Sequence, residues 1–188
     1  RKNKRCAILT LEMTMAQIVY RMLEVDPDLT HAHRKNIILT DNVYDVDEVY
    51  AAATRLASQN TLHFIGVDYA DMLVGTKEQS ESVMGRIYNS LSVLAKKTRI
   101  PVILVAQYRR TDGKIPTIQD IRYSGRAEQA ASMILLLYNP SQVFSRSSHK
   151  DETMVLPRIP GAAHIIVGKT RYRSPQQPTS TGAIRVHW

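Results

Sequence analysis

Glu12, Asp68 and Gln107 each stand at the end of a continuous apolar run, and together they have the chemistry needed to hydrolyse a nucleotide. An aspartate after a hydrophobic strand can hold Mg²⁺ through water. A second carboxylate can orient and deprotonate the attacking water, and a neutral amide can register a terminal phosphate. Taken singly, each of the three can equally be a polar residue that marks a strand end.

The apolar runs that precede these residues predict buried strands of a parallel sheet. They cover residues 6–11, 62–68 and 101–107, and a helix at about 80–98 separates the last two. Strand, helix and strand in this order form a βαβ unit, and strands that are apolar on both faces are typical of a parallel sheet covered by helices. Ligands bind beyond the carboxyl ends of such strands, so we expect the three polar residues to share one rim.

The remaining pattern predicts an α/β fold in a single domain, residues 1–188. Thr14 is placed to cap a helix that Asp26-Pro27 ends, and a second helix is expected at 46–58. The stretch 31–45 is polar and poorly patterned. Further predictions are a strand at 132–138, a flexible insertion at 139–162, and an edge hairpin formed by 163–169 and 182–188.

Composition restricts the class of protein. The 188 residues are 44% hydrophobic and 22% charged, which is typical of a soluble globular domain. No apolar run approaches the roughly 20 residues that cross a bilayer, so we expect no membrane embedding. Cys6 is the only cysteine, which excludes an internal disulfide and favours a reducing cytoplasm. His31, His33 and His149 are expected to be solvated, because nothing places a third metal ligand beside them.

The net charge of +8 favours a polyanionic partner, although a basic surface without one gives the same number. Basic residues gather at 99–126 and 169–173, mostly in segments interrupted by Gly or Pro. Cations in loops are accessible to phosphates in a way that cations on a solvated helix need not be.

Five segments occur in the order and approximate spacing of DnaB-type replicative helicases, and the chain resembles that family. The segments are ILTLEM (8–13), VDYADML (67–73), PVILVAQYRR (101–110), DIRYSGRAEQAA (120–131) and IIVGKTR (165–171). The fourth is the most specific, because nucleotide-binding folds in general do not share it. The resemblance implies a RecA-like ATPase fold.

For the nucleotide site, the resemblance implies that Glu12 is the catalytic glutamate and Asp68 the Walker B aspartate associated with Mg²⁺. Gln107 matches the sensor of the ATP γ-phosphate. Lys169 and Arg171 match the pair that reaches the ATP site of the neighbouring subunit, with Arg171 as arginine finger; otherwise Arg171 is a surface cation of the hairpin.

For DNA, the resemblance implies that the segment at 120–128 is the loop of the central channel. Arg122, Tyr123, Gly125 and Arg126 then contact the backbone of single-stranded DNA. A glycine lets backbone amides approach a phosphate closely, and the planar guanidinium of Arg suits phosphate oxygens. The alternative for Arg122 and Arg126 is a solvated loop.

The chain departs from the family at several positions. The complete Walker A pattern G-x-x-x-x-G-K-[ST] is absent, because the one Gly-Lys-Thr, at 168–170, has Ala163 where the first glycine is required. We expect that loop to precede Arg1; a degenerate relative is the alternative. As written, the chain is expected not to hydrolyse ATP. The stretch between the second helix and the run at 62–68 is shorter than in the family, and a strand is hard to place there, so residues are expected to be missing near 58–61. Tyr123 stands where an acid is usual, which suggests a divergent phage or mobile-element branch.

These observations favour a hexameric, ring-forming DNA helicase motor that uses ATP and Mg²⁺ on single-stranded DNA. Primase and a helicase loader are the expected protein partners, as in a primosome, in the cytoplasm of a bacterial cell or phage-infected host. Two other functions stay open: a RecA/RadA-type recombination ATPase, and a DNA-binding or ring-assembly module without catalysis.

Overall fold

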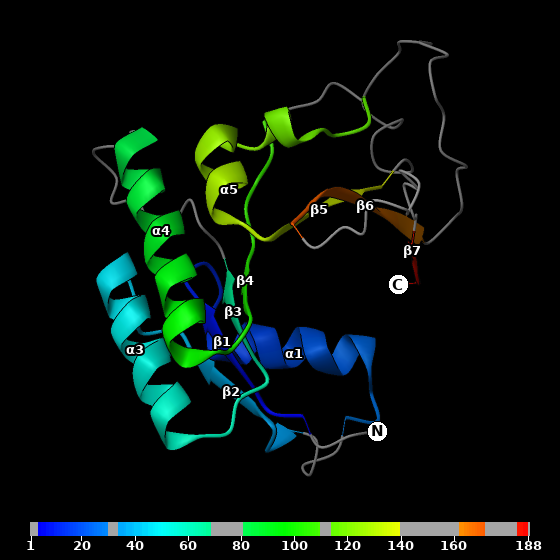
Figure 1. The fold of residues 1–188 in the computed structure, drawn as a ribbon. Helices are drawn as coiled ribbons and strands as arrows, with labels where there is room; N and C mark the ends of the chain where they lie inside the picture. The colour runs from blue at the N-terminus through cyan, green and yellow to red at the C-terminus, as the bar shows by residue number, and fades with distance from the viewer. Residues whose placement is uncertain are drawn as a thin grey trace. The chain divides into compact units, whose positions relative to one another are not determined.

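A computed structural model gives the fold of the chain (Figure 1). Its contacts divide the chain into two compact units, Arg1–Gln107 and Tyr108–Trp188, which are described separately. The single domain over 1–188 stays a prediction. Nearly all of the expected insertion at 139–162 lies outside the described residues. The structure describes residues 4–29, 34–68, 81–109, 114–139, 162–171 and 184–187.

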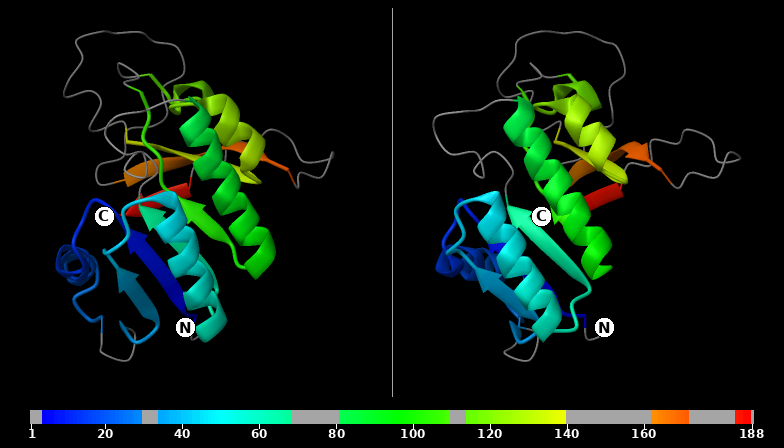
Figure 2. Two further views of the ribbon diagram at one scale, coloured as in Figure 1. Left: turned by 90° about the vertical axis from the view of Figure 1, so that its left-hand side faces the viewer. Right: turned by 60° about the vertical axis from the view of Figure 1, so that its left-hand side comes forward.

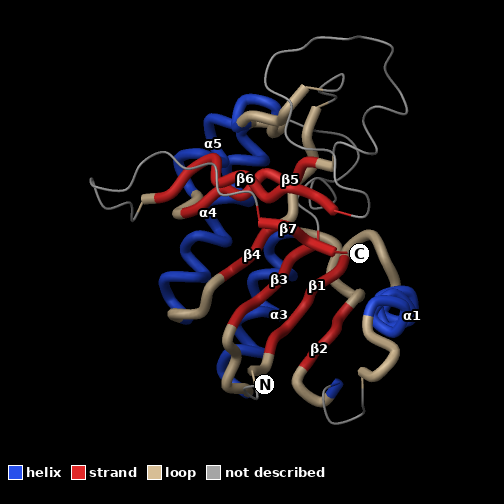
Figure 3. Tube along the Cα trace, turned by 90° about the vertical axis from the view of Figure 1, so that its right-hand side faces the viewer, coloured by secondary structure: helices blue, strands red, loops and turns tan. Residues whose placement is uncertain are grey.

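The first unit is built on a four-stranded parallel sheet in the order β2-β1-β3-β4. Figure 3 shows these strands running side by side. Leu9 lies opposite Val67, and Val67 lies opposite Leu104, which sets the register of the three strands predicted from apolar runs. The strands are β1 (Cys6–Thr10), β2 (Ile37–Thr40), β3 (Phe64–Asp68) and β4 (Val102–Leu104).

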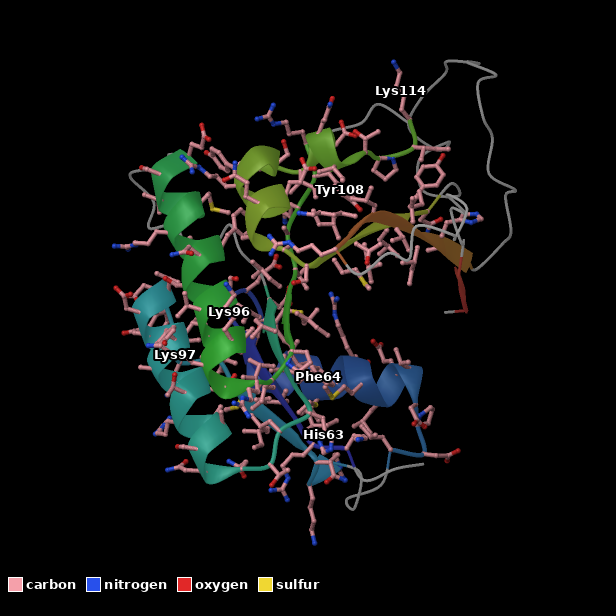
Figure 4. All side chains as sticks on the ribbon, viewed as in Figure 1. His63, Phe64, Lys96, Lys97, Tyr108 and Lys114 are labelled. Atoms are coloured by element: carbon pink, nitrogen blue, oxygen red, sulfur yellow. The ribbon has the colours of Figure 1, made fainter. Side chains whose placement is uncertain are left out.

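Three helices accompany this sheet: α1 (Met15–Val25), α3 (Val46–Gln59) and α4 (Glu81–Thr98). α3 and α4 pack side by side and cover one face of the sheet, and α1 lies on the opposite side (Figures 1 and 2). Lys97 of α4, labelled in Figure 4, contacts α3. Its ammonium lies over the ring of Tyr50 of α3, 5.7 Å from the ring centroid. The parallel sheet flanked by helices confirms the predicted α/β class.

The two faces of the sheet differ in burial. Ala7, Leu9, Ile65 and Val67 alternate along β1 and β3 onto one face and are at most 1% exposed. Residues i and i+2 share a face of a strand, so these four meet the apolar stripes of α3 and α4. Asp68 and its partner Thr10 therefore lie on the opposite face, which α3 and α4 do not cover.

The cap predicted for α1 is confirmed. The Thr14 hydroxyl accepts a hydrogen bond from the Gln17 amide at 3.3 Å, and the Gln17 side chain accepts one from the Thr14 amide at 2.9 Å. This reciprocal pair is a capping box. None of the residues of α1 is buried. The Asp41 carboxylate also accepts a hydrogen bond from the Met15 amide at 2.9 Å, so hydrogen bonds, more than burial, stabilise the helix start.

The sequence reasoning missed a strand within residues 31–45, and the expectation that residues are missing near 58–61 stays a prediction. The additional strand is β2, which precedes α3 and pairs with β1, with Ile38 opposite Ala7. Residues 60–63 then lead from α3 directly into β3. β2 has only four residues, all half-buried, so its pairing with β1 defines it more than its own apolar pattern does.

The second unit contains a three-stranded antiparallel sheet, β5-β6-β7. The predicted hairpin is confirmed as β6 and β7, and β6 also pairs with β5 (Figure 3). The residues predicted as the 120–128 loop form instead a short 3-10 turn and a helix. The elements are η2 (Ile118–Asp120), α5 (Ser124–Ala130), β5 (Met133–Tyr138), β6 (Ala162–Thr170) and β7 (Ile184–His187).

Tyr108 fastens the start of this unit to β5 (Figure 4). Its hydroxyl accepts a hydrogen bond from the Leu137 amide at 2.6 Å and donates to the Leu137 carbonyl at 3.3 Å. Burial raises the pKa of this phenol, so it stays a neutral donor. We expect Tyr108→Phe to lower the free energy of unfolding by about 1 kcal/mol, the net worth of such a bond. Urea denaturation measures the change.

The matched control for this substitution is Tyr20→Phe, because Tyr20 on α1 is 65% exposed. It removes the same hydroxyl from the surface and should leave the unfolding midpoint unchanged. Equal effects of the two substitutions would contradict a structural role for the Tyr108 hydroxyl.

Within the described part of the chain, no helix is both long enough and apolar enough to cross a membrane.

Candidate functional site

The three polar residues predicted to share one rim do follow strands that end at the same edge of the parallel sheet. Asp68 ends β3 opposite Thr10, and the Leu11 amide donates to the Asp68 carbonyl at 2.7 Å. The Val105 amide donates to the Val67 carbonyl at 3.0 Å, which extends the pairing beyond β4 toward Gln107. Glu12 lies two residues past the end of β1. The topology therefore places all three at the carboxyl edge.

Glu12 sits in a turn that Thr10 stabilises. The Thr10 hydroxyl donates to the Met13 carbonyl at 2.9 Å and accepts from the Met13 amide at 3.1 Å. Thr10 is only 1% exposed, whereas Glu12 is exposed. The buried Thr10 side chain therefore fixes a turn on which the Glu12 side chain is exposed to solvent. Sequence reasoning missed Thr10, because a threonine within an apolar run reads as an ordinary β-branched strand residue.

Asp68 is half-buried at the end of β3. Burial raises the pKa of its carboxyl, and the positive charge of Arg21 on α1 partly opposes the rise. A nearby cation stabilises the charged form of a poorly solvated carboxylate. The environment of Asp68 therefore suits a Mg²⁺ ion held through water. Among the described residues no group of three or more His, Cys, Asp or Glu could ligate a metal, so this cation would depend on Asp68 together with the phosphates of a nucleotide.

We expect Asp68→Asn to raise the melting temperature of the ligand-free protein at neutral pH. Because the folded state raises the pKa of Asp68, it binds more protons than the unfolded chain; stability from this group is present below its ordinary pKa of 3.8 and is lost as pH rises. Asparagine does not ionise and so does not lose this stability as pH rises. The increase in melting temperature should therefore vanish below pH 3.8, where Asp68 is also neutral in both states. Asp28 is exposed, and the control Asp28→Asn should not change the melting temperature.

An open groove of about 390 Å³ lies along α1 and contains none of the three edge residues. Its sides come from the helix itself, with Tyr20 and Arg21 among them. The lining residues are Met13, Ala16, Gln17, Tyr20, Arg21 and Glu24. The groove neighbours the Glu12 turn through Met13, but its composition is that of a helix surface and not of a phosphate site.

In the second unit, the residues predicted to contact DNA surround the start of α5. Tyr123 is the N-terminal flanking residue of the helix and has a positive φ of 56°, which costs a non-glycine residue about 1 kcal/mol or more. Gly125 and Arg126 lie in its first turn and are exposed, and Arg122 is half-buried. A Cβ built on Gly125 would meet nothing within 4 Å. The space beside the Gly125 backbone is therefore open to a ligand.

The start of α5 is tied to the chain that follows Gln107. Tyr108 forms an isolated β-bridge with Ile121, and the Arg109 amide donates to the Asp120 carbonyl at 2.7 Å. The Asp120 carboxylate accepts from the Thr117 amide at 2.6 Å and so closes the turn of η2. The segment directly after the predicted phosphate sensor thus contacts the segment directly before the predicted DNA residues.

Lys169 and Arg171 lie at the end of β6 and contact the other end of α5. The Lys169 ammonium donates to the Glu128 carbonyl, and the Arg171 guanidinium donates to the Gln129 carbonyl. The two predicted trans-acting cations therefore engage their own subunit here. His31, His33 and His149 lie outside the described residues.

Comparisons with known proteins agree with this arrangement. The family model described as the DnaB-like helicase C terminal domain matches residues 26–180. The replicative DNA helicase DnaB of Geobacillus stearothermophilus is 27% identical over 179 residues, which cover 79% of this chain and 39% of that protein. The same-named protein of Buchnera aphidicola is 30% identical over 200 residues, covering 90% and 41%. The chain thus spans about two fifths of the length of these relatives.

Solved structures show the same fold. A DnaB-like replicative helicase, studied with its primase interactions, superposes with a TM-score of 0.70 at 19% identity, over 90% of this chain and 46% of that one. A KaiC-like protein from Pyrococcus horikoshii gives 0.60 at 14% identity, over 97% and 70%. These likenesses establish the RecA-like fold, and the family match covers well over half of the residues. The chain belongs to the DnaB-like helicase C-terminal domain family.

Proposed function

We propose that this chain is the motor part of an ATP-driven replicative DNA helicase. The observation that carries the proposal is the placement of Glu12, Asp68 and Gln107 at one edge of a parallel sheet in a member of this family. That edge is where ligands of open parallel sheets bind. The activity is proposed for the whole protein, because the 188 residues contain no complete G-x-x-x-x-G-K-[ST] phosphate loop.

The three edge residues divide the chemistry of hydrolysis. Asp68, whose carboxylate is poorly solvated because of burial, would hold Mg²⁺, and the ion would supply positive charge beside the phosphates. Glu12, exposed on its turn, orients the attacking water and accepts its proton. Gln107 contacts the γ-phosphate and passes the state of the nucleotide to the segment that begins at Tyr108.

Lys169 and Arg171 act in the ATP site of the neighbouring subunit, with Arg171 as the arginine finger. The planar guanidinium stabilises charge that develops on the transferred phosphate. This requires a ring, which we propose to be hexameric, with a primase and a helicase loader as further partners. The DnaB-like helicase of similar fold has primase interactions, which supports the first of these partners. We place the protein in the cytoplasm of a bacterial cell or phage-infected host.

Single-stranded DNA is proposed to bind at the start of α5. Arg122 and Arg126 supply charge, Gly125 leaves its backbone open, and Tyr123 sets the direction in which the helix begins. Such contacts go to phosphates and therefore carry little sequence preference. Movement of this turn along the strand during hydrolysis would drive unwinding.

The test of DNA binding is the double substitution Arg122→Ala and Arg126→Ala. We expect weaker binding of every single-stranded sequence and a decrease of about 1 per lost phosphate contact in the slope of log affinity against log salt. Fluorescence anisotropy over a salt series measures both quantities. Arg86→Ala on the exposed surface of α4 is the control for loss of an arginine. An unchanged slope with a folded double variant would remove these arginines from the DNA site.

A further inference from the structure

Two cations occupy the C-terminal end of α5. The last carbonyls of a helix have no partner within the helix, and the helix dipole makes that end negative. The Ala127 carbonyl is bonded by the Ala131 amide at 2.9 Å. The next two carbonyls, those of Glu128 and Gln129, accept hydrogen bonds from Lys169 and Arg171. The predicted finger pair therefore completes the end of this helix.

The topology of the unit makes this contact a consequence of the fold. α5 ends at Ala130, and β5 begins three residues later at Met133. β6 runs antiparallel to β5, so its last residue, Thr170, lies opposite Met133. The Arg171 amide donates to the Ser132 carbonyl at 2.9 Å and continues the pairing. The end of β6 thus has to arrive beside the end of α5.

A β-bulge at Gly168 places Lys169 on the face of β6 from which it contacts α5. Leu135 pairs with Val167, but Ile134 pairs with Lys169, so Gly168 is an extra residue on β6. Val167 and Leu135 share the exposed face of the sheet, where regular alternation would also place Lys169. The bulge moves Lys169 to the face of Ile134, which is 7% exposed.

A side chain at the bulge position would crowd its neighbours, which would have to shift by a few tenths of an ångström. A Cβ built on Gly168 would lie 3.0 Å from Cγ1 of Ile118 and 3.2 Å from Cδ1 of Leu136. Ile118 belongs to η2, the turn that leads to α5. The same residue, Gly168, therefore brings β6 close to η2 and sets the face of β6 on which Lys169 lies.

We infer that α5 positions the finger pair and couples it to the DNA site of the same subunit. The inference rests on the proposed function. The start of α5 carries the DNA residues, and its end holds Lys169 and Arg171 through the carbonyls of Glu128 and Gln129. Side chains that move to phosphates in the neighbouring subunit leave those carbonyls, and the last turn of α5 loses its stabilising charges. ATP binding in the neighbouring subunit and DNA binding at the start of α5 thereby affect each other's affinity, and such coupling is reciprocal.

The experiment uses protein free of nucleotide, in which a finger has no phosphate to contact. Lys169→Ala and Arg171→Ala are each expected to speed hydrogen exchange of the amides at 126–131 by about two- to fivefold, the effect of one charge at a helix end. Each should also weaken binding of single-stranded DNA, measured by anisotropy, by a similar factor. Lys169→Arg, which keeps a charged donor, should restore both values.

Lys114→Ala is the matched control, because Lys114 is an exposed cation outside α5 in the same unit (Figure 4). It should leave exchange at 126–131 unchanged. Unchanged exchange in both finger variants would overturn the coupling while leaving a finger role intact. Conversely, undiminished ATP turnover of Arg171→Ala rings would overturn the finger role, whatever the exchange result. The two failures are therefore distinguishable.

Discussion

Replacing Glu12 with glutamine is expected to preserve nucleotide binding and to lower ATP turnover by about 10²–10⁴-fold, the contribution of a positioned general base. The amide keeps the size and hydrogen-bonding capacity of the carboxylate but does not accept the proton of the attacking water. Binding should persist because Glu12 sits on an exposed turn, anchored by Thr10, and is not expected to hold the phosphates or the metal.

The measurement compares steady-state hydrolysis with the affinity for a fluorescent ATP analogue, in protein that carries a phosphate loop ahead of residue 1. Glu24→Gln is the matched control, because Glu24 is an exposed acid on α1 in the same unit. Full turnover in the Glu12 variant would remove this residue from the mechanism. A parallel loss of binding would instead assign it to nucleotide affinity.

Arg171→Ala is expected to lower turnover of the assembled ring by about 10³–10⁵-fold, the range for arginine fingers in GTPases. The loss should appear only in the assembled state if the guanidinium acts on the ATP of the adjacent subunit. Arg86→Ala on α4 provides the control for removing a surface arginine. This effect and that of Glu12→Gln far exceed the factor of about five that a lost hydrogen bond of about 1 kcal/mol produces.

Mixed rings test directly whether Arg171 acts in trans. Subunits with Glu12→Gln still carry Arg171, and subunits with Arg171→Ala still carry Glu12. In a randomly mixed ring, about a quarter of the head-to-tail interfaces combine the two intact residues. Turnover should therefore recover when the two inactive proteins are mixed. No recovery, in rings shown to exchange subunits, would place Arg171 in the site of its own subunit.

The chain's local patterns determined the α/β class and most element positions. Continuous apolar runs predicted β1, β3 and β4, because strands buried in a parallel sheet need apolar residues on both faces. Thr14 indicated the start of α1, because a capping side chain bonds to backbone amides only a few residues away. The polar residues that follow the apolar runs were predicted to share one edge of the sheet, because neighbouring parallel strands all end on the same side. Each of these features depends on short-range chemistry, or on a rule that holds for every parallel sheet.

Tertiary structure alone decided the features that depend on contacts between distant residues. β2 is an apolar run of only four residues, too short to predict a strand by itself, and its pairing with β1 makes it one. The raised pKa of Asp68 comes from burial that the sequence does not display. The bulge at Gly168 moves the Lys169 side chain to the other face of the sheet, and the bulge is visible only in the pairing of β6 with β5. The sequence thus supplied the reactive groups, whereas the directions in which they point came from pairing across the sheets.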